Sequence, residues 1–140
     1  MSSTNTQFSI AVHLMVGLGL NSPNGVTSNS MAKSVNASPS FVRRTLSKLS
    51  KAGLVHTTTG KTGACTIARN PKDISLLDIH EAVESPKAFA IHQYPEEKTC
   101  QVSCHIKPAL ERVLVKTQKS MDESLRKMSL FEVIADIQRG

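Results

Sequence analysis

The sequence predicts a mainly α fold with a small β-hairpin, in which a long helix near the C-terminus follows a compact N-terminal region. Two observations support this prediction. Apolar residues recur at helical spacing along most of the 140-residue chain, and they form a continuous seam from residue 106 to residue 128. A β-branched stretch with a glycine-containing turn interrupts this pattern at residues 54–68. A chain of this length forms one domain, or one domain with an added assembly element.

The first predicted helix covers residues 6–20 and is apolar on almost every side, as expected of a buried helix. A second, short helix over residues 27–35 would direct Met31, Ala32 and Val35 inward. The next residues, beginning with Asn36, form a tight turn, because asparagine tolerates the left-handed backbone conformation that such a turn requires.

The helix after this turn has two different faces. Ser38 is a good N-cap residue, and Pro39 suits the first helical position. Val42, Leu46 and Leu49 form an apolar stripe that is suited to a hydrophobic core. Another face carries polar and basic residues: Ser40, Arg43, Arg44, Ser47, Lys48 and Lys51. Helix, short turn and basic helix together are the helix-turn-helix pattern.

A β-hairpin is predicted directly after the basic helix. Gly53 ends the helix, and residues 54–59 and 64–68 are strand-like, with a turn at residues 60–63 between them. A hairpin in this position is a wing, so the sequence predicts a winged helix-turn-helix.

Charge is distributed unevenly along the chain. Residues 1–72 contain eight Lys or Arg residues and no Asp or Glu, and the first acidic residue is Asp73. The remaining residues contain nine basic and eleven acidic groups, so the N-terminal region carries +8 and the rest −2 of the formal net charge of +6. Such segregation is typical of a surface that binds the phosphates of double-stranded DNA. The expected DNA contacts are Thr27, Ser28, Ser38, Ser40, Arg43, Arg44, Ser47, Lys48, Lys51, Lys61 and Arg69.

These elements divide the chain into three regions. Residues 1–73 form the DNA-binding region, residues 74–105 a linking helix and a polar, cysteine-bearing loop, and residues 106–140 a long helix followed by a short one. Ser75 can cap the linking helix, which ends before Pro86. Ser129 and Glu132 form a capping box at the start of the last helix.

The long helix has a narrow apolar seam with charged residues on both sides, as in a coiled coil. It is longer than a small core requires, so we expect a homodimer; the alternative is an ordinary surface helix. The expected dimerisation residues are Ile106, Leu110, Val113, Met121 and Leu125.

Other classes of protein fit the sequence less well. The chain has no Trp and a single Tyr, which argues against an RNA-binding sheet or a single-strand stacking platform. It has neither an apolar run long enough to cross a membrane nor a secretion signal, and we expect a cytoplasmic protein with reduced thiols.

An enzyme is the second class considered. Gly60, Lys61 and Thr62 are similar to the end of a phosphate-binding loop, but Val55 stands where that loop requires a glycine. No catalytic set of side chains stands out, so no enzymatic activity is expected. A protein-interaction adaptor that uses the winged fold without DNA is a further alternative.

Taken together, these features resemble the Rrf-two family of bacterial transcription regulators, which includes iron–sulfur and nitric-oxide sensors. The matching segments are residues 11–13, 38–44, 49–55, 60–63 and 70–84, so the resemblance covers nearly the whole chain. It implies a dimeric repressor or activator whose long helix pairs two winged heads on a palindromic operator. It also implies that the segment before this helix senses a signal.

The sequence departs from the family in this sensing segment. Cluster-binding members carry three cysteines before the long helix, whereas this chain has Cys100 and Cys104 only. Iron–sulfur ligation normally needs more thiolates, so we expect no cofactor. A zinc set of Cys100, Cys104, His92 and His105 is an alternative, although the adjacent Cys104 and His105 are awkward partners. A further alternative is that the two cysteines are spare thiols in a mobile loop.

The interpretation we favour is a thiol switch at Cys100 and Cys104. The neighbouring Lys98, His105 and Lys107 would lower the thiol pKa, as a redox sensor requires. The chain thus resembles the subgroup of the family that responds to oxidants or electrophiles. Cys65, in the wing, is either a structural hydrophobe or a third redox partner.

Overall fold

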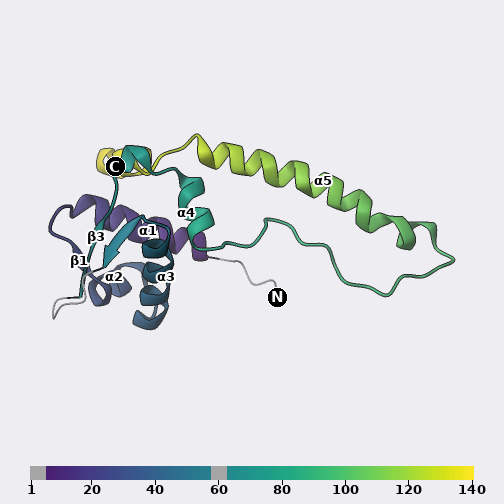
Figure 1. Cartoon of the computed structure of the whole chain (residues 1–140), viewed down its shortest axis with the longest axis horizontal. Coiled ribbons are helices and arrows are strands. Elements are labelled where there is room, and N and C mark those ends of the chain that lie inside the picture. The colour runs from purple at the N-terminus through teal and green to yellow at the C-terminus, as the bar shows by residue number, and fades with distance from the viewer. Residues whose placement is uncertain (1–5, 58–62) are drawn as a thin grey trace.

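The protein forms a head built around helix α1 (Gln7–Leu20), from which one long helix extends (Figure 1). The computed structural model describes residues 6–57 and 63–140. After α1 come strand β1 (Val26–Thr27), helices α2 (Ser28–Val35) and α3 (Pro39–Lys51), and strands β2 (Val55–Thr57) and β3 (Ala64–Ile67). The short 3-10 helix η1 (Pro71–Asp73) and helices α4 (Leu76–Ala82), α5 (Gln101–Arg126) and α6 (Leu130–Arg139) follow. The predicted mainly α fold with a small β element is confirmed.

Local capping explains why α2 and α3 begin where the sequence predicted. The Oγ1 of Thr27 accepts a hydrogen bond from Ser30 N at 3.2 Å, and the Oγ of Ser38 accepts one from Phe41 N at 3.2 Å. Each such cap contributes about 1 kcal/mol to helix stability. Between the two helices, Asn36 has a left-handed backbone with φ of 56°. The turn therefore has the conformation that asparagine was expected to supply.

The sheet has three antiparallel strands in the order β1-β3-β2, so β1 adds a third strand to the hairpin of β2 and β3. The sequence did not predict β1, because a strand of two residues has no periodicity of its own. Val26 pairs with Cys65, and Gly25 before it has φ of 88°. A Cβ on Gly25 would lie 2.8 Å from the carbonyl oxygen of Cys65, so only glycine permits this close approach. The connection between α1 and α2 is thus fixed to the wing.

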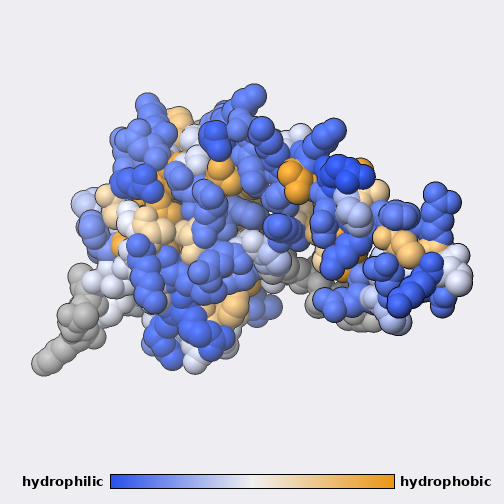
Figure 2. Space-filling view, turned by 45° about the vertical axis from the view of Figure 1, so that its right-hand side comes forward, coloured by the Kyte–Doolittle hydropathy of each residue, from blue (hydrophilic) through white to orange (hydrophobic). Residues whose placement is uncertain are grey.

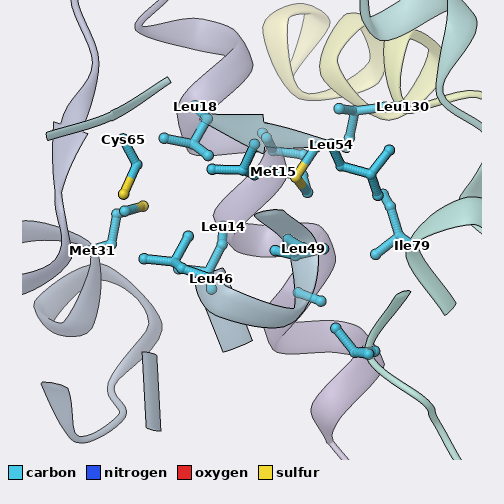
Figure 3. Close-up of a cluster of buried hydrophobic side chains, with 14 of the residues drawn as sticks. Leu14, Met15, Leu18, Met31, Leu46, Leu49, Leu54, Cys65, Ile79 and Leu130 are labelled. Atoms are coloured by element: carbon cyan, nitrogen blue, oxygen red, sulfur yellow. The ribbon is translucent and has the colours of Figure 1, made fainter. Parts of the chain in front are cut away.

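The core of the head is built from α1, α3 and the elements that surround them. Leu14, Met15 and Leu18 of α1 and Leu49 of α3 are almost completely buried, and Figure 3 shows them beside Leu46, Leu54 and Ile79. Burying a side chain of this size contributes about 1.5–3 kcal/mol. The apolar stripe that the sequence predicted on α3 therefore faces the core, and its polar face points to solvent.

Helix α6 belongs to the head, although the sequence grouped it with the long helix. Its Leu130 is fully buried, and Ile134 also lies in the core. Leu130 N donates to Ile74 O at 2.8 Å and Leu76 N donates to Met128 O at 2.9 Å, so the start of α6 is bonded to the start of α4. The chain therefore returns to the head after α5.

Residues 84–100 leave α4, run outward and turn back into α5 at its far end (Figure 1). The sequence predicted a loop up to residue 105, but α5 already begins at Gln101. Cys100 is its N-cap, with Sγ accepting from Ser103 N at 3.4 Å, and Ser103 Oγ accepts from Glu97 N at 2.8 Å. These bonds begin a helix in a stretch too polar to show apolar periodicity.

No residue of the 26-residue helix α5 is buried. Hydrophobic side chains reach the surface between hydrophilic ones in the part of the molecule that contains α5, on the right of Figure 2. In the described part of the chain, no helix combines the length and the apolar character needed to span a bilayer.

Candidate nucleic-acid interface

The polar face of α3 is available to a partner. Ser40, Arg43, Arg44, Ser47 and Lys51 are exposed and Lys48 is half-buried. They are carried by the same helix whose opposite stripe is buried in the core, so the core fixes the direction in which they point. A rigid helix with this division of faces is suited to entering the major groove of DNA.

The N-terminal half of α3 carries two adjacent arginines, Arg43 and Arg44, which form no ion pair with a carboxylate of the described residues. The ion pairs found in the described residues, Arg126–Glu123 and Arg139–Asp136, lie on α5 and α6 and not in the head's basic region. The guanidinium carbon of Arg44 lies 5.8 Å from the centre of the Phe41 ring. Both arginines are therefore free to bind an external anion or a base edge.

Helix α2 adds hydroxyl groups and one further cation. Thr27 and Ser38 are exposed N-cap residues of α2 and α3, and Ser28 is half-buried in the first turn of α2. Helix N-termini favour phosphate because their free backbone N–H groups and dipole attract negative charge. Lys33 on α2 is also exposed. Lys33 is not among the contacts that the sequence predicts, although its charge belongs to the same basic pattern.

The structure does not place all of the expected DNA-contacting residues on one surface. Arg69 is exposed but follows β3 at the base of the hairpin, where Ala68 N donates to Leu54 O at 3.0 Å. It therefore lies at the end of the hairpin away from the wing tip. Lys61, which the sequence places in the turn of the predicted hairpin, lies outside the described residues.

The two cysteines of the sensing segment lie at the start of α5. Cys100 is exposed, and Cys104 is half-buried in the first turn of the helix, where its N–H donates to Cys100 O at 3.1 Å. The Sγ of Cys104 donates to the carbonyl oxygens of Glu97, at 3.5 Å, and Lys98, at 3.7 Å. The backbone in front of the helix thus holds Cys104 in its thiol form.

Electrostatics at Cys104 differ from the expectation. Desolvation raises the pKa of the Cys104 thiol, and a hydrogen bond and the negative charge of Glu96 raise it further, as does Cys100. The prediction that neighbouring basic residues lower this pKa is therefore wrong for Cys104, because desolvation and the nearby Glu96 and Cys100 raise it. Burial likewise raises the pKa of Cys65, which packs in the core beside Met31 (Figure 3). This location agrees with a structural hydrophobe.

The fold and the exposed basic helix define the class: a winged helix-turn-helix, DNA-binding transcription regulator. The chain belongs to the Rrf2 (Rrf-two) family, whose model, described as an iron-dependent transcriptional regulator, matches residues 4–136. The resemblance found in the sequence is thereby confirmed.

Individual relatives agree with this assignment. The chain is 33% identical over 131 residues to YwnA of Bacillus subtilis, named as an HTH-type transcriptional regulator; the match covers 93% of this chain and 96% of YwnA. A crystal structure described as a DNA-binding protein is 28% identical, with a TM-score of 0.73, covering 91% of this chain and 98% of the other. IscR of T. potens has the same fold, with a TM-score of 0.68 at 24% identity over 97% of this chain and 88% of its own.

The iron that the family description implies does not fit the donors of this chain. Iron–sulfur clusters are normally held by four cysteine thiolates, or by histidines replacing some of them. Cys100 and Cys104 share the first turn of α5, whereas Cys65 is buried in β3. His92 stacks on Tyr94 with a centroid separation of 4.9 Å. Among the described residues, no group of three or more His, Cys, Asp or Glu side chains is placed to hold a metal ion.

Proposed function

We propose that this protein is a homodimeric repressor that binds a palindromic operator through α3 and releases it when cysteines at the start of α5 react with an oxidant or electrophile. Such a regulator acts in the cytoplasm, where the operator lies. Membership of a family of transcription regulators supports the DNA-binding part of this proposal. The exposed side of α5 supports the dimer, and the position of the cysteines supports the signal.

One observation carries the DNA-binding proposal: the exposed polar face of α3 belongs to a head with no acidic residue before Asp73. In a helix-turn-helix, residues near the start of the second helix reach base edges. Ser40, Arg43 and Arg44 occupy this part of α3, and Arg can bind guanine with two hydrogen bonds. Lys48 and Lys51, further along the helix, are suited to phosphates.

Fluorescence anisotropy of a labelled operator duplex, selected from a random library and titrated at several salt concentrations, tests this proposal. A dimer that neutralises roughly six to eight phosphates gives a log–log salt slope of about −5 to −7. A protein-interaction adaptor with the same fold would bind no duplex at any salt concentration. Binding without a preferred sequence would contradict an operator-specific regulator.

The exposed side of α5 supports a homodimer. Val113 is 56% exposed and Met121 41% exposed, while Ile106 and Leu110 are half-buried. A second copy of the seam would cover these side chains and remove apolar area from water. Leu125, which we expected in the same seam, packs against the core of the head instead. The proposed dimer contact therefore centres on the middle of α5.

The position of the cysteines supports a link between thiol chemistry and DNA binding. Cys100 and Cys104 are an N-cap and a first-turn residue, which a disulfide can join only by distorting the turn. In that reaction two thiols lose two protons and two electrons; hydrogen peroxide accepts them and becomes two water molecules. The distortion would change the start of α5, and α5 would set the separation of the two heads.

A further inference from the structure

A groove of about 780 Å³ lies between residues 86–93 and α5, away from α3. One hydrogen bond ties its two sides together, from Ala88 N to Gln118 Oε1 at 3.1 Å. The volume falls in the range of small-molecule sites, roughly 300–1,000 Å³. Neither the DNA-binding proposal nor the cysteine switch uses this groove.

Both walls of the groove carry apolar side chains that are open to solvent. Pro86, Phe89 and Ile91 line one side, and Leu114 and Val115 of α5 line the other. Phe89 is 59% exposed and Val115 63% exposed. Exposed side chains of this size on facing walls favour an apolar ligand, since its binding removes both surfaces from water.

The charges of the groove are not balanced. Among its acidic side chains, Glu123 pairs with Arg126 at 2.9 Å, and Asp122 accepts a hydrogen bond from Gln118 at 2.9 Å. Glu111 makes no ion pair within the described part of the chain. The same holds for Lys87, Lys107 and Lys119, which also line the groove. Asp122 keeps its charge, because the Gln118 amide is neutral. The groove therefore holds four cations against three carboxylates, and this net positive charge favours an anion.

The groove and the proposed dimer seam occupy different faces of α5. Lys107, Leu114 and Gln118 border the groove, spaced at seven and four residues along one side of the helix. Ile106, Leu110 and Val113 follow another side and do not line the groove. A second copy bound at the seam therefore leaves the groove open to a ligand.

We propose that this groove binds an amphipathic organic anion, with an aromatic or short aliphatic body and a carboxylate or sulfonate group. The apolar body lies between Phe89 and Val115, and the anionic group lies near Lys119, which is one helical turn from Val115 on α5. Such a ligand joins residues 86–93 to α5, next to the segment that carries the cysteines. Its role as an effector rests on the proposed function; its binding does not.

Anilinonaphthalene sulfonate, an amphipathic anion whose fluorescence rises in apolar surroundings, tests binding to the full chain without DNA. We expect Val115→Asp to weaken binding about tenfold, because it removes apolar contact and adds a negative charge. Val102→Asp is the matched control, since Val102 is 66% exposed on the same helix outside the groove. Equal affinities of the two variants would overturn the proposal.

Two further comparisons test charge and location. Lys119→Glu should weaken binding several-fold, while Lys116→Glu, outside the groove, should not. The uncharged analogue phenylnaphthylamine should bind more weakly than the sulfonate; equal binding would refute the anionic preference. If sedimentation shows that Val115→Asp separates a dimer, the groove is an interface between copies and the ligand proposal is wrong. A failure to bind DNA would leave all these measurements unaffected and would count against the proposed function alone.

Discussion

The guanidinium carbon of Arg44 lies 5.8 Å from the centre of the Phe41 ring, one turn earlier on α3. Phe41 is half-buried and Arg44 exposed, so the ring offers a fixed surface beside a side chain that is otherwise mobile. A cation above an aromatic ring at an exposed site gains about 0.5–1 kcal/mol. The ring thus limits the orientations of Arg44 before any DNA is bound.

Replacing this ring should therefore weaken operator binding through Arg44. We expect Phe41→Leu to cost about 0.5–1 kcal/mol of operator affinity in the wild-type chain and almost nothing in an Arg44→Ala background. Anisotropy titrations of the four proteins give this double-mutant cycle. Additive losses would show that Phe41 acts on binding independently of Arg44.

The arginines themselves should determine sequence preference. Arg43→Ala or Arg44→Ala is expected to cost about 1–3 kcal/mol on the operator and much less on random duplex DNA, because arginine reads guanine through two hydrogen bonds. Arg139→Ala, on α6, removes an exposed arginine far along the chain and serves as the control for net charge. Equal losses on both DNAs would assign the mutated arginine to a phosphate.

A charge in the middle of the seam should separate the two copies. Leu110→Glu buries an unpaired carboxylate if α5 is the dimer contact, so we expect monomers that bind the operator poorly. Lys116→Glu changes charge on the same helix outside the seam and should remain dimeric. Sedimentation velocity distinguishes the two outcomes, and an intact Leu110→Glu dimer would place the contact elsewhere.

Cys100 and Cys104 should be alkylated at different rates. The raised pKa of Cys104 keeps it protonated at neutral pH, so its alkylation should be slow there and accelerate as the pH rises toward that pKa. The exposed Cys100 should be modified first, as mass mapping at several pH values can show. Faster alkylation of Cys104 than of Cys100 at neutral pH would contradict this order.

Oxidation should then act on DNA binding through the same pair. We expect peroxide or a quinone to lower operator affinity, Cys100→Ser to abolish this response and Cys104→Ser to reduce it. A gel shift with the oxidised proteins provides the measurement. Release of DNA by the oxidised double variant would assign the response to Cys65 or to no thiol.

A strained residue at the end of α4 offers a test of stability alone. Glu84 has φ of 54°, a left-handed conformation, and its N–H donates to Glu81 O at 3.1 Å. Glycine adopts this conformation without the cost that a Cβ imposes, so Glu84→Gly should stabilise the fold by about 1 kcal/mol. The thermal unfolding midpoint of Glu84→Gly is compared with that of Glu81→Gly. Residue 81 lies inside α4, so glycine there should destabilise the fold. An unchanged or lower midpoint for Glu84→Gly would mean that its carboxylate makes a compensating contact.

The sequence by itself determined α2, α3 and the turn between them. Ser38, Pro39 and Asn36 act on the backbone within a few residues, and the stripe of Val42 and Leu46 marks the buried face. The sequence also shows the uneven distribution of charge, and this predicts DNA binding, because electrostatic attraction to DNA depends on where the ionisable residues are concentrated. Local chemistry was sufficient for these features.

Tertiary structure decided the features that join distant segments. The pairing of Val26 with Cys65, the return of α6 to the core through Leu130, and the groove between residues 86–93 and α5 have no local signature. The same is true of the pKa of Cys104, which its surroundings raise although basic residues lie next to it in sequence. Hydrogen bonding, burial and charge act between neighbours in space, and only the folded chain establishes which residues those neighbours are.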